Sequence, residues 1–182
     1  FLAPGLGGFF GEVQYSMGEN QRHTPGADDG TGFSGRVGWR SGPFGIAVAT
    51  ARTDYQQTAT NGDIRSTNVG ASYDFQIVEV WAGYYRDKVE SFQPVTATGY
   101  VVGVIVPVGV HQIKFAWSRY GTDAIGDPAA RKLSLGYVYS FSKRSVAYAT
   151  YSYLSNSGGS AAGLNGSITA PDRRSYGDHL GM

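Results

Sequence analysis

Seven polar or charged side chains of this chain recur at positions where they could act on small ions. They are Glu12, Gln14, Arg36, Arg40, Gln112, Lys114 and Lys132. Each lies on the parity of an alternating segment that otherwise carries small or polar residues. Charges on the wall of a narrow aqueous passage enrich permeating ions, because the low-dielectric surroundings focus their field. If these residues line such a passage, Arg36 and Lys114 bias it toward anions. The alternative is that both pair with acids such as Glu12 or Glu79, which would leave little selectivity.

A second set of cations lies on the apolar parity, at segment ends beside long connections. These residues are Arg52, Arg65, Arg86, Arg119 and Arg131. An arginine that faces lipid costs about 2–4 kcal/mol at mid-bilayer and about 0–1 kcal/mol near the interface. If the chain crosses a bacterial outer membrane, the set is therefore expected at headgroup height, where guanidinium groups can bind the phosphates of lipopolysaccharide in bidentate contacts. The alternative is solvated charge, or pairing with Asp54, Asp63 and Asp87.

Catalytic and metal-binding patterns are not found in the sequence. The histidines His23, His111 and His179 share no spacing with one another or with acids that would indicate a triad or a metal site. The chain has no cysteine, which excludes a disulfide scaffold and a cysteine-ligated zinc site. The glycine-rich stretches 5–11 and 155–163 precede no predicted helix, so they are not phosphate-binding loops. We therefore expect no catalytic, cofactor or metal residues.

Composition narrows the class of protein further. The 182 residues include 27 glycines and 14% aromatic residues, but only 16% charged residues against roughly 25% in soluble domains. No uncharged apolar run approaches the roughly 18 residues of a membrane-spanning helix. A net charge of +1 argues against a nucleic-acid partner. No basic segment followed by an apolar one opens the chain, which indicates mature protein or an internal fragment.

The dominant pattern has a period of two, which is typical of β-strands. In residues 131–141, Leu133, Leu135 and Tyr137 share one parity, while Ser134 and Gly136 hold the other. Ten strands are predicted, and no helix. The predicted ranges are 9–17, 32–40, 44–55, 64–75, 78–88, 96–107, 110–120, 130–141, 145–154 and 175–182. Their connections are predicted to alternate strictly between short and long, as in an antiparallel transmembrane barrel with short periplasmic turns.

The class depends on which parity faces outward, and alternation alone does not decide this. A soluble sandwich would bury the apolar parity, whereas a membrane barrel turns it toward lipid. Several predicted strands run 9–12 residues, the length that crosses a bilayer when tilted. Aromatic residues such as Phe44, Tyr139 and Phe141 gather near strand ends, and the other parity is rich in glycine, serine and asparagine. These features favour an integral β-barrel of a bacterial outer membrane, built as one domain over residues 1–182.

Several blocks of the sequence resemble Gram-negative general porins. The most specific is KLSLGYVYSFSKRSVAYATYSYLSN at residues 132–156, followed by a Gly/Ser-rich loop and SYGDHLGM at 175–182. The blocks VGASYDFQIVEVWAGYYRDK at 69–88 and GLGGFFGEVQYSMGEN at 5–20 are similar to internal strand pairs of that family. The resemblance implies a homotrimer of sixteen-stranded barrels. Each barrel would form a water-filled channel for passive diffusion of ions and small hydrophilic solutes, here with a preference for anions.

Two departures from the family pattern bear on how much of a barrel is present. Ten predicted strands against sixteen imply that further strands precede this segment, and with them the family's constriction loop. Family chains close with an aromatic residue, whereas this one ends at Met182, so we read it as a C-terminal portion that lacks its last few residues. Two alternatives remain open: a closed ten-stranded barrel with protease activity, and a soluble β-sandwich binding module. The protease would use rim carboxylates such as Asp54, Asp87 and Asp123 with a histidine.

Overall fold

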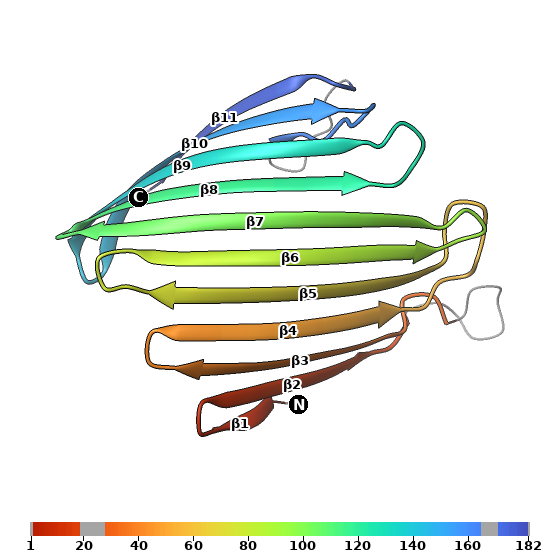
Figure 1. Ribbon diagram of the computed structural model, residues 1–182, viewed down its shortest axis with the longest axis horizontal. Coiled ribbons are helices and arrows are strands. Elements are labelled where there is room, and N and C mark those ends of the chain that lie inside the picture. Colours follow the sequence, from red (N-terminus) through yellow and green to blue (C-terminus); the bar gives the residue numbers. More distant parts are fainter. Residues whose placement is uncertain (1, 19–27, 165–170, 182) are drawn as a thin grey trace. The chain divides into compact units, whose positions relative to one another are not determined.

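The computed structural model describes residues 2–18, 28–164 and 171–181. Eleven strands run through them: β1 Leu2–Leu6, β2 Phe9–Ser16, β3 Gly32–Ser41, β4 Phe44–Thr53, β5 Asp63–Asp74, β6 Glu79–Glu90, β7 Val95–Val108, β8 His111–Thr122, β9 Ala129–Ser142, β10 Ser145–Ser157 and β11 Arg174–Gly181. They form one sheet in which the strands follow one another in chain order (Figure 1). The predicted all-β antiparallel meander is confirmed. Within the described part of the chain, no helix has the length and hydropathy needed to cross a membrane.

The number of strands was predicted too low by one. The additional strand, β1, pairs antiparallel with β2, with a register irregularity between Ala3 and Leu6. Its five residues include Pro4, which cannot donate a ladder hydrogen bond, and they show too short an alternation to be recognised. Gly7 and Gly8 form the turn into β2 at φ values of 58° and 89°, a conformation that side chains with a Cβ rarely adopt.

The chain separates into two compact units, which we describe one at a time. Unit 1 comprises Phe1–Ala71 and Gly83–Thr98, and unit 2 comprises Ser72–Ala82 and Gly99–Met182. In unit 1 the turns β1–β2 and β3–β4 lie at one strand end, and the connection β4–β5 lies at the other (Figure 1). In unit 2 the turns β7–β8 and β9–β10 lie opposite the connection β8–β9.

The predicted strict alternation of loop length fails at one position. The connection between β6 and β7, residues 91–94, is as short as the one between β5 and β6, residues 75–78. Strand pairing continues further into this connection than the sequence pattern indicated, to Glu90 and from Val95. The hydroxyl of the buried Ser91 donates a 2.6 Å hydrogen bond to the Gln93 carbonyl, which tightens the remaining turn.

Each unit leaves its apolar parity exposed rather than burying it. In unit 1, Val37 stands opposite Val48, and their exposed fractions are 59% and 41%. In unit 2, Phe115 stands opposite Leu135, with exposed fractions of 45% and 53%. Among the described residues, no side chain is less than 2% exposed. A soluble sandwich requires one apolar face to be buried against a second layer, and the described residues supply no such layer.

Candidate functional site: the polar face and the arginines at the strand ends

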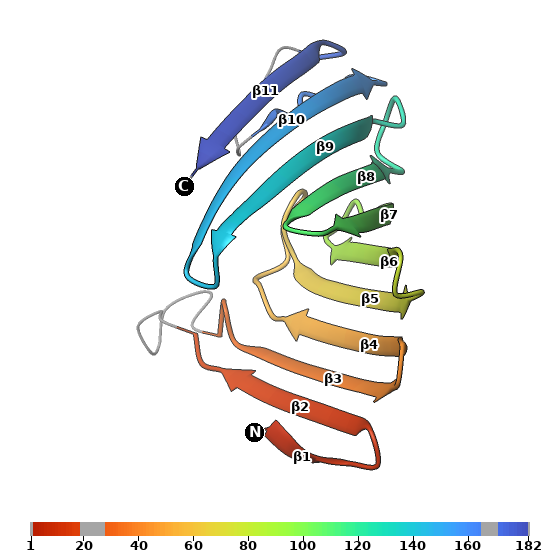
Figure 2. The same cartoon turned by 90° about the vertical axis from the view of Figure 1, so that its left-hand side faces the viewer.

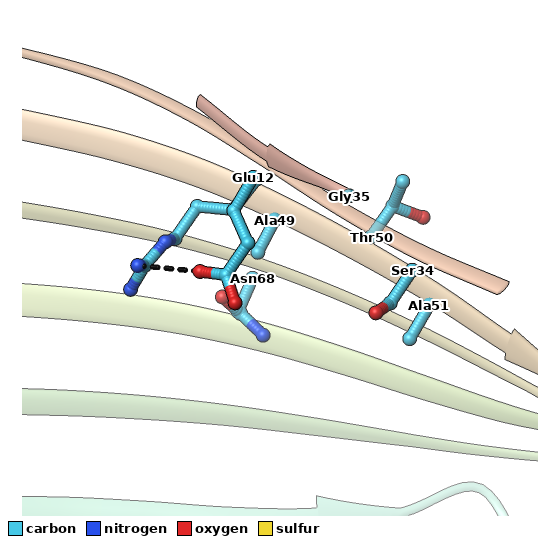
Figure 3. Close-up of a pocket in the computed structure, with 8 residues that line it drawn as sticks. Glu12, Ser34, Gly35, Ala49, Thr50, Ala51 and Asn68 are labelled. Carbon is cyan, nitrogen blue, oxygen red and sulfur yellow. Dashed lines mark hydrogen bonds and ion pairs between the residues drawn. The ribbon is translucent and has the colours of Figure 1, made fainter. Parts of the chain in front are cut away.

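The polar face of unit 1 holds an ion pair beside a shallow hollow. Glu12 on β2 stands directly opposite Arg36 on β3, and Arg36 Nη2 lies 2.7 Å from Glu12 Oε2. The guanidinium also lies 5.8 Å from the centre of the Phe10 ring, at the distance of a cation–π contact. Figure 3 shows the hollow, about 470 Å³ including the open solvent above it. It is lined by Glu12, Ser34, Gly35, Arg36, Ala49, Thr50, Ala51 and Asn68.

Two further predicted residues of this face lie on the same two strands. Gln14 stands opposite Ser34, and Arg40 stands opposite Gly45 beside the β3–β4 turn. The backbone amide of Arg40 donates a 2.9 Å hydrogen bond to the Gly8 carbonyl, which ties the β1–β2 turn to β3. No ion pair joins the Arg40 side chain to another described residue. Of the four cationic side chains predicted on the polar parity, only Arg36 meets the alternative of pairing with an acid among the described residues.

The polar face of unit 2 carries two lysines among small residues. Gln112 stands opposite Val138, Lys114 opposite Gly136, and Lys132 opposite Ser118. Between them, the Ser134 and Ser152 hydroxyls form a 2.9 Å hydrogen bond across β9 and β10. Among the described residues, no carboxylate forms an ion pair with either lysine. Each unit therefore brings its own predicted residues onto one face.

The arginines predicted at the strand ends fall into two groups. Arg52 pairs with Asp54 at 2.9 Å and with Asp63 at 2.7 Å, as the pairing alternative expected. Arg65 pairs at 3.2 Å with Glu90, an acid that sequence reasoning did not assign to it. Lys88 contacts the same carboxylate at 3.2 Å. By contrast, Arg86, Arg119 and Arg131 are exposed and form no ion pair within the described ranges.

Among the described side chains, His111 contacts tyrosines rather than acids. His111 Nδ1 forms a 2.7 Å hydrogen bond with Tyr137 Oη, and its ring stacks 5.8 Å from the Tyr137 ring. His23 lies outside the described residues, and for His179 only the backbone pairing with Thr150 is described. Among the described residues, no three His, Cys, Asp or Glu side chains gather as a metal site would require. The His111–Tyr137 contact was missed because a 26-residue separation indicates pairing only once the register is known.

Glycines on the polar parity make room for aromatic side chains. A Cβ at Gly103 on β7 would collide with the indole of Trp81 on β6, and a Cβ at Gly38 would collide with the Phe10 ring. Phe10 and Trp81 thus pack against these glycines, each in its own unit, close to a strand end that leads into a short turn.

Comparison with known protein families identifies this architecture. The model of the Gram-negative porin family matches residues 2–159. The chain is a member of the Gram-negative porin family. This confirms the predicted resemblance to Gram-negative porins.

Individual relatives agree with this membership. The chain is 30% identical over 172 residues to outer membrane porin protein 32 of Delftia acidovorans, covering 90% of this chain and 47% of the relative. It is 25% identical to an outer membrane porin protein of Bordetella pertussis, covering 86% of this chain and 51% of that porin. The chain therefore spans about half the length of the curated porins it matches.

Solved porin structures share the fold. An anion-selective porin from Comamonas acidovorans superposes with a TM-score of 0.88 at 24% identity, over 98% of this chain and 56% of that one. OmpF of Salmonella typhi superposes with a TM-score of 0.66 at 17% identity, over 80% of this chain and 49% of that one. At these identities, the superpositions establish the barrel-type meander and nothing finer.

Proposed function

We propose that the protein is an outer-membrane porin, a water-filled channel for passive diffusion of ions and small hydrophilic solutes with a preference for anions. Membership of the porin family and the names of the outer-membrane relatives support the channel and its location. One solved neighbour is described as anion-selective, and another as a trimer form. We infer a homotrimer for this protein as well.

The charge of Lys114, unpaired among the described residues, is the observation that supports the proposed preference for anions. It stands on the polar face of unit 2 opposite Gly136, so the neighbouring strand offers no side chain to shield it. No described carboxylate pairs with its ammonium group. A fixed, uncompensated cation on the wall of an aqueous pore raises the local concentration of anions. Arg36 contributes less, because Glu12 offsets its charge at 2.7 Å.

The pore-lining set in this proposal is the polar parity predicted from the sequence. It consists of Glu12, Gln14, Arg36, Arg40, Gln112, Lys114 and Lys132. The opposite parity, with exposed residues such as Val37, Phe115 and Leu135, faces lipid. Turning the apolar parity toward hydrocarbon relieves an exposure that would be unfavourable in water, at about 25 cal/mol per Å² of apolar surface.

The test is the reversal potential of the full-length protein in a planar bilayer under a KCl gradient. Conductance steps in groups of three, with a potential displaced toward chloride, are expected. Steps with a potential displaced toward potassium would retain the porin and refute the preference for anions. The absence of any conductance from correctly folded protein would refute the channel itself.

Outer-membrane lipid, including lipopolysaccharide, is the second partner we infer. The arginines predicted for this contact do not contribute equally, because Arg52 and Arg65 are already neutralised by acids of their own unit. Replacing both with serine is therefore expected to leave the amount of co-purified lipopolysaccharide unchanged. A marked loss of lipopolysaccharide from this variant would show that these two arginines do bind lipid.

A further inference from the structure

Four polar residues of unit 2 form one row across the outward face of β8, β9, β10 and β11. Arg119 stands directly opposite Arg131, Arg131 stands opposite Ser155, and Ser155 stands opposite Arg174. Directly opposed residues of an antiparallel pair point to the same face of the sheet. These strands lie side by side in both views of the molecule (Figures 1 and 2). We call Arg119, Arg131 and Arg174 the arginine row.

The arginine row carries three positive charges with no described acid set against them. All three side chains are exposed, and no ion pair joins any of them to another described residue. The six residues of the β10–β11 connection that the structure does not describe, 165–170, include no Asp or Glu in the sequence. Like charges directly opposite each other on neighbouring strands destabilise the pairing. A bound anion would relieve the repulsion between Arg119 and Arg131.

The row immediately below, toward the strand centres, is aromatic and apolar. Trp117 stands opposite Leu133, Leu133 opposite Tyr153, and Tyr153 opposite Tyr176. We call these four residues the aromatic row. The exposed fractions of Trp117, Leu133 and Tyr176 are 39%, 43% and 61%, and the Tyr153 and Tyr176 ring centres lie 5.1 Å apart. Aromatic belts mark the boundary between hydrocarbon and headgroups in transmembrane barrels.

We propose that the arginine row binds the phosphate groups of a lipopolysaccharide headgroup whose acyl chains pack along the aromatic row. This inference rests on the proposed outer-membrane location. Guanidinium groups present a planar fork that matches phosphate, and charge-assisted contacts of this kind are roughly twice as strong as neutral ones. Arg119 and Arg131 share one phosphate. Arg174 lies two strand spacings from Arg131, about 10 Å, and it meets a second phosphate on the same headgroup.

The juxtaposition of the two rows favours a lipid over a free anion. A soluble phosphate would gain from the three guanidinium groups but nothing from the exposed Trp117 and Leu133 beside them. A phospholipid or lipopolysaccharide contacts both rows, because its charged headgroup is joined to acyl chains. The headgroup lies against the arginine row and the acyl chains lie against the aromatic row. Arg52 and Arg65 supply a natural comparison, since their charges are already balanced by Asp54, Asp63 and Glu90.

The experiment measures lipopolysaccharide that remains bound to the full-length protein after purification in mild detergent. The test variant is Arg119→Ser/Arg131→Ser/Arg174→Ser, and the matched control is Arg52→Ser/Arg65→Ser. Folding is monitored by the heat-modifiable electrophoretic band, and channel activity by planar-bilayer conductance. Loss of one charged hydrogen bond weakens binding by about tenfold or more, so the test variant is expected to retain less than about a tenth of the wild-type lipid.

A second arm separates a lipid site from a site for free phosphate. Delipidated protein in detergent is titrated with lipopolysaccharide, with chemically dephosphorylated lipopolysaccharide and with inorganic phosphate. Tight binding of the first ligand alone, lost in the test variant, supports the proposal. Equal binding of the dephosphorylated lipid, or binding of inorganic phosphate with the same affinity, would overturn it.

The conductance measurement keeps this inference apart from the proposed function. Test-variant channels that conduct normally while retaining wild-type lipid would refute the arginine row and leave the porin intact. Failure of the wild-type protein to conduct would refute the proposed function itself. If the triple variant does not fold, the single variants Arg119→Ser and Arg131→Ser carry the same test, because each removes one half of the opposed pair.

Discussion

Glu12 and Arg36 occupy directly opposite positions on β2 and β3, and 2.7 Å separates Glu12 Oε2 from Arg36 Nη2. The pair is about half exposed, with side-chain exposures of 36% and 50%. An ion pair of this kind stabilises the sheet by less than about 1 kcal/mol. Its larger consequence is electrical, because it cancels a positive charge on the face that we assign to the pore.

Glu12→Gln is expected to increase the preference for anions by releasing the charge of Arg36. Two unit charges 4 Å apart in water interact with about 1 kcal/mol, which corresponds to roughly a fivefold change in local anion occupancy. Arg36→Gln is expected to shift the preference in the opposite direction, because it leaves Glu12 alone. Reversal potentials under a KCl gradient measure both changes. Gln112→Asn, a neutral change on the same parity, is the control, and equal potentials in all three variants would contradict the assignment.

Lys114→Gln is expected to reduce the preference for anions by removing a cation that no described acid balances. The effect should be large at about 0.1 M salt and small at about 1 M, where the Debye length falls from roughly 10 Å to 3 Å. Lys143→Gln, in the β9–β10 turn, is the matched control and should change the potential less. Salt-independent or equal shifts in the two variants would argue against Lys114 as a pore residue.

Gly103→Val is expected to destabilise the sheet, because the new side chain takes the space that the Trp81 indole fills. Overpacking of this kind typically costs about 1–3 kcal/mol. The temperature at which the heat-modifiable band converts to the unfolded form should therefore fall. Adding Trp81→Leu should restore part of the loss. If the conversion temperature of the double variant falls by the sum of the falls in the two single variants, Gly103 and Trp81 are not energetically coupled.

Asn156→Ala is expected to loosen the β10–β11 connection. The Asn156 side chain is 6% exposed, and its amide donates hydrogen bonds of 2.8 Å to the Ala162 carbonyl and 2.9 Å to the Arg173 carbonyl. Removing a buried partner in this way costs about 1–3 kcal/mol. Trypsin cleavage after Arg173 should accelerate while the heat-modifiable band persists.

The control for this experiment is Asn61→Ala in the β4–β5 connection. The backbone amide of Asn61 donates a hydrogen bond to the Thr58 hydroxyl, and the Asn61 carbonyl accepts from the amide and hydroxyl of Thr58. The Asn61 side chain forms no hydrogen bond with another described residue. Cleavage rates that rise equally in the two variants would show that Asn156 has no special role in the connection.

Most strands could be predicted from the sequence because apolar and polar side chains alternate along them, one kind on each face. Leu133, Leu135 and Tyr137 all stand on one face of β9, as their shared parity predicted, and Arg36 and Lys114 stand on the polar faces of their units. β1 was missed because Pro4 and the flanking glycines interrupt a pattern that is only five residues long. Parity is a local property, so it survives errors of a residue or two at strand ends.

Register is not local, and most of what sequence reasoning missed depends on it. Arg174 was left out of the predicted strands by a single residue, yet the pairing with Ser155 brings it into line with Arg131. The contact between Arg65 and Glu90 joins residues 25 positions apart and was likewise not expected. The pore-lining roles stay a prediction, because they concern what passes along the polar face rather than how the face is built.

The alternation that gives each strand two faces also determines how such a chain reaches its membrane. Apolar residues interrupted at every second position keep the mean hydropathy at −0.23, even though aromatic residues such as Phe33, Phe115 and Tyr137 are exposed. A translocation channel in an inner membrane halts segments that are apolar throughout for about 20 residues. A segment patterned in this way offers no such run, so the alternation is compatible with passage of the unfolded segment through that channel. A continuous apolar surface forms only when the chain folds into strands and its side chains separate onto two faces.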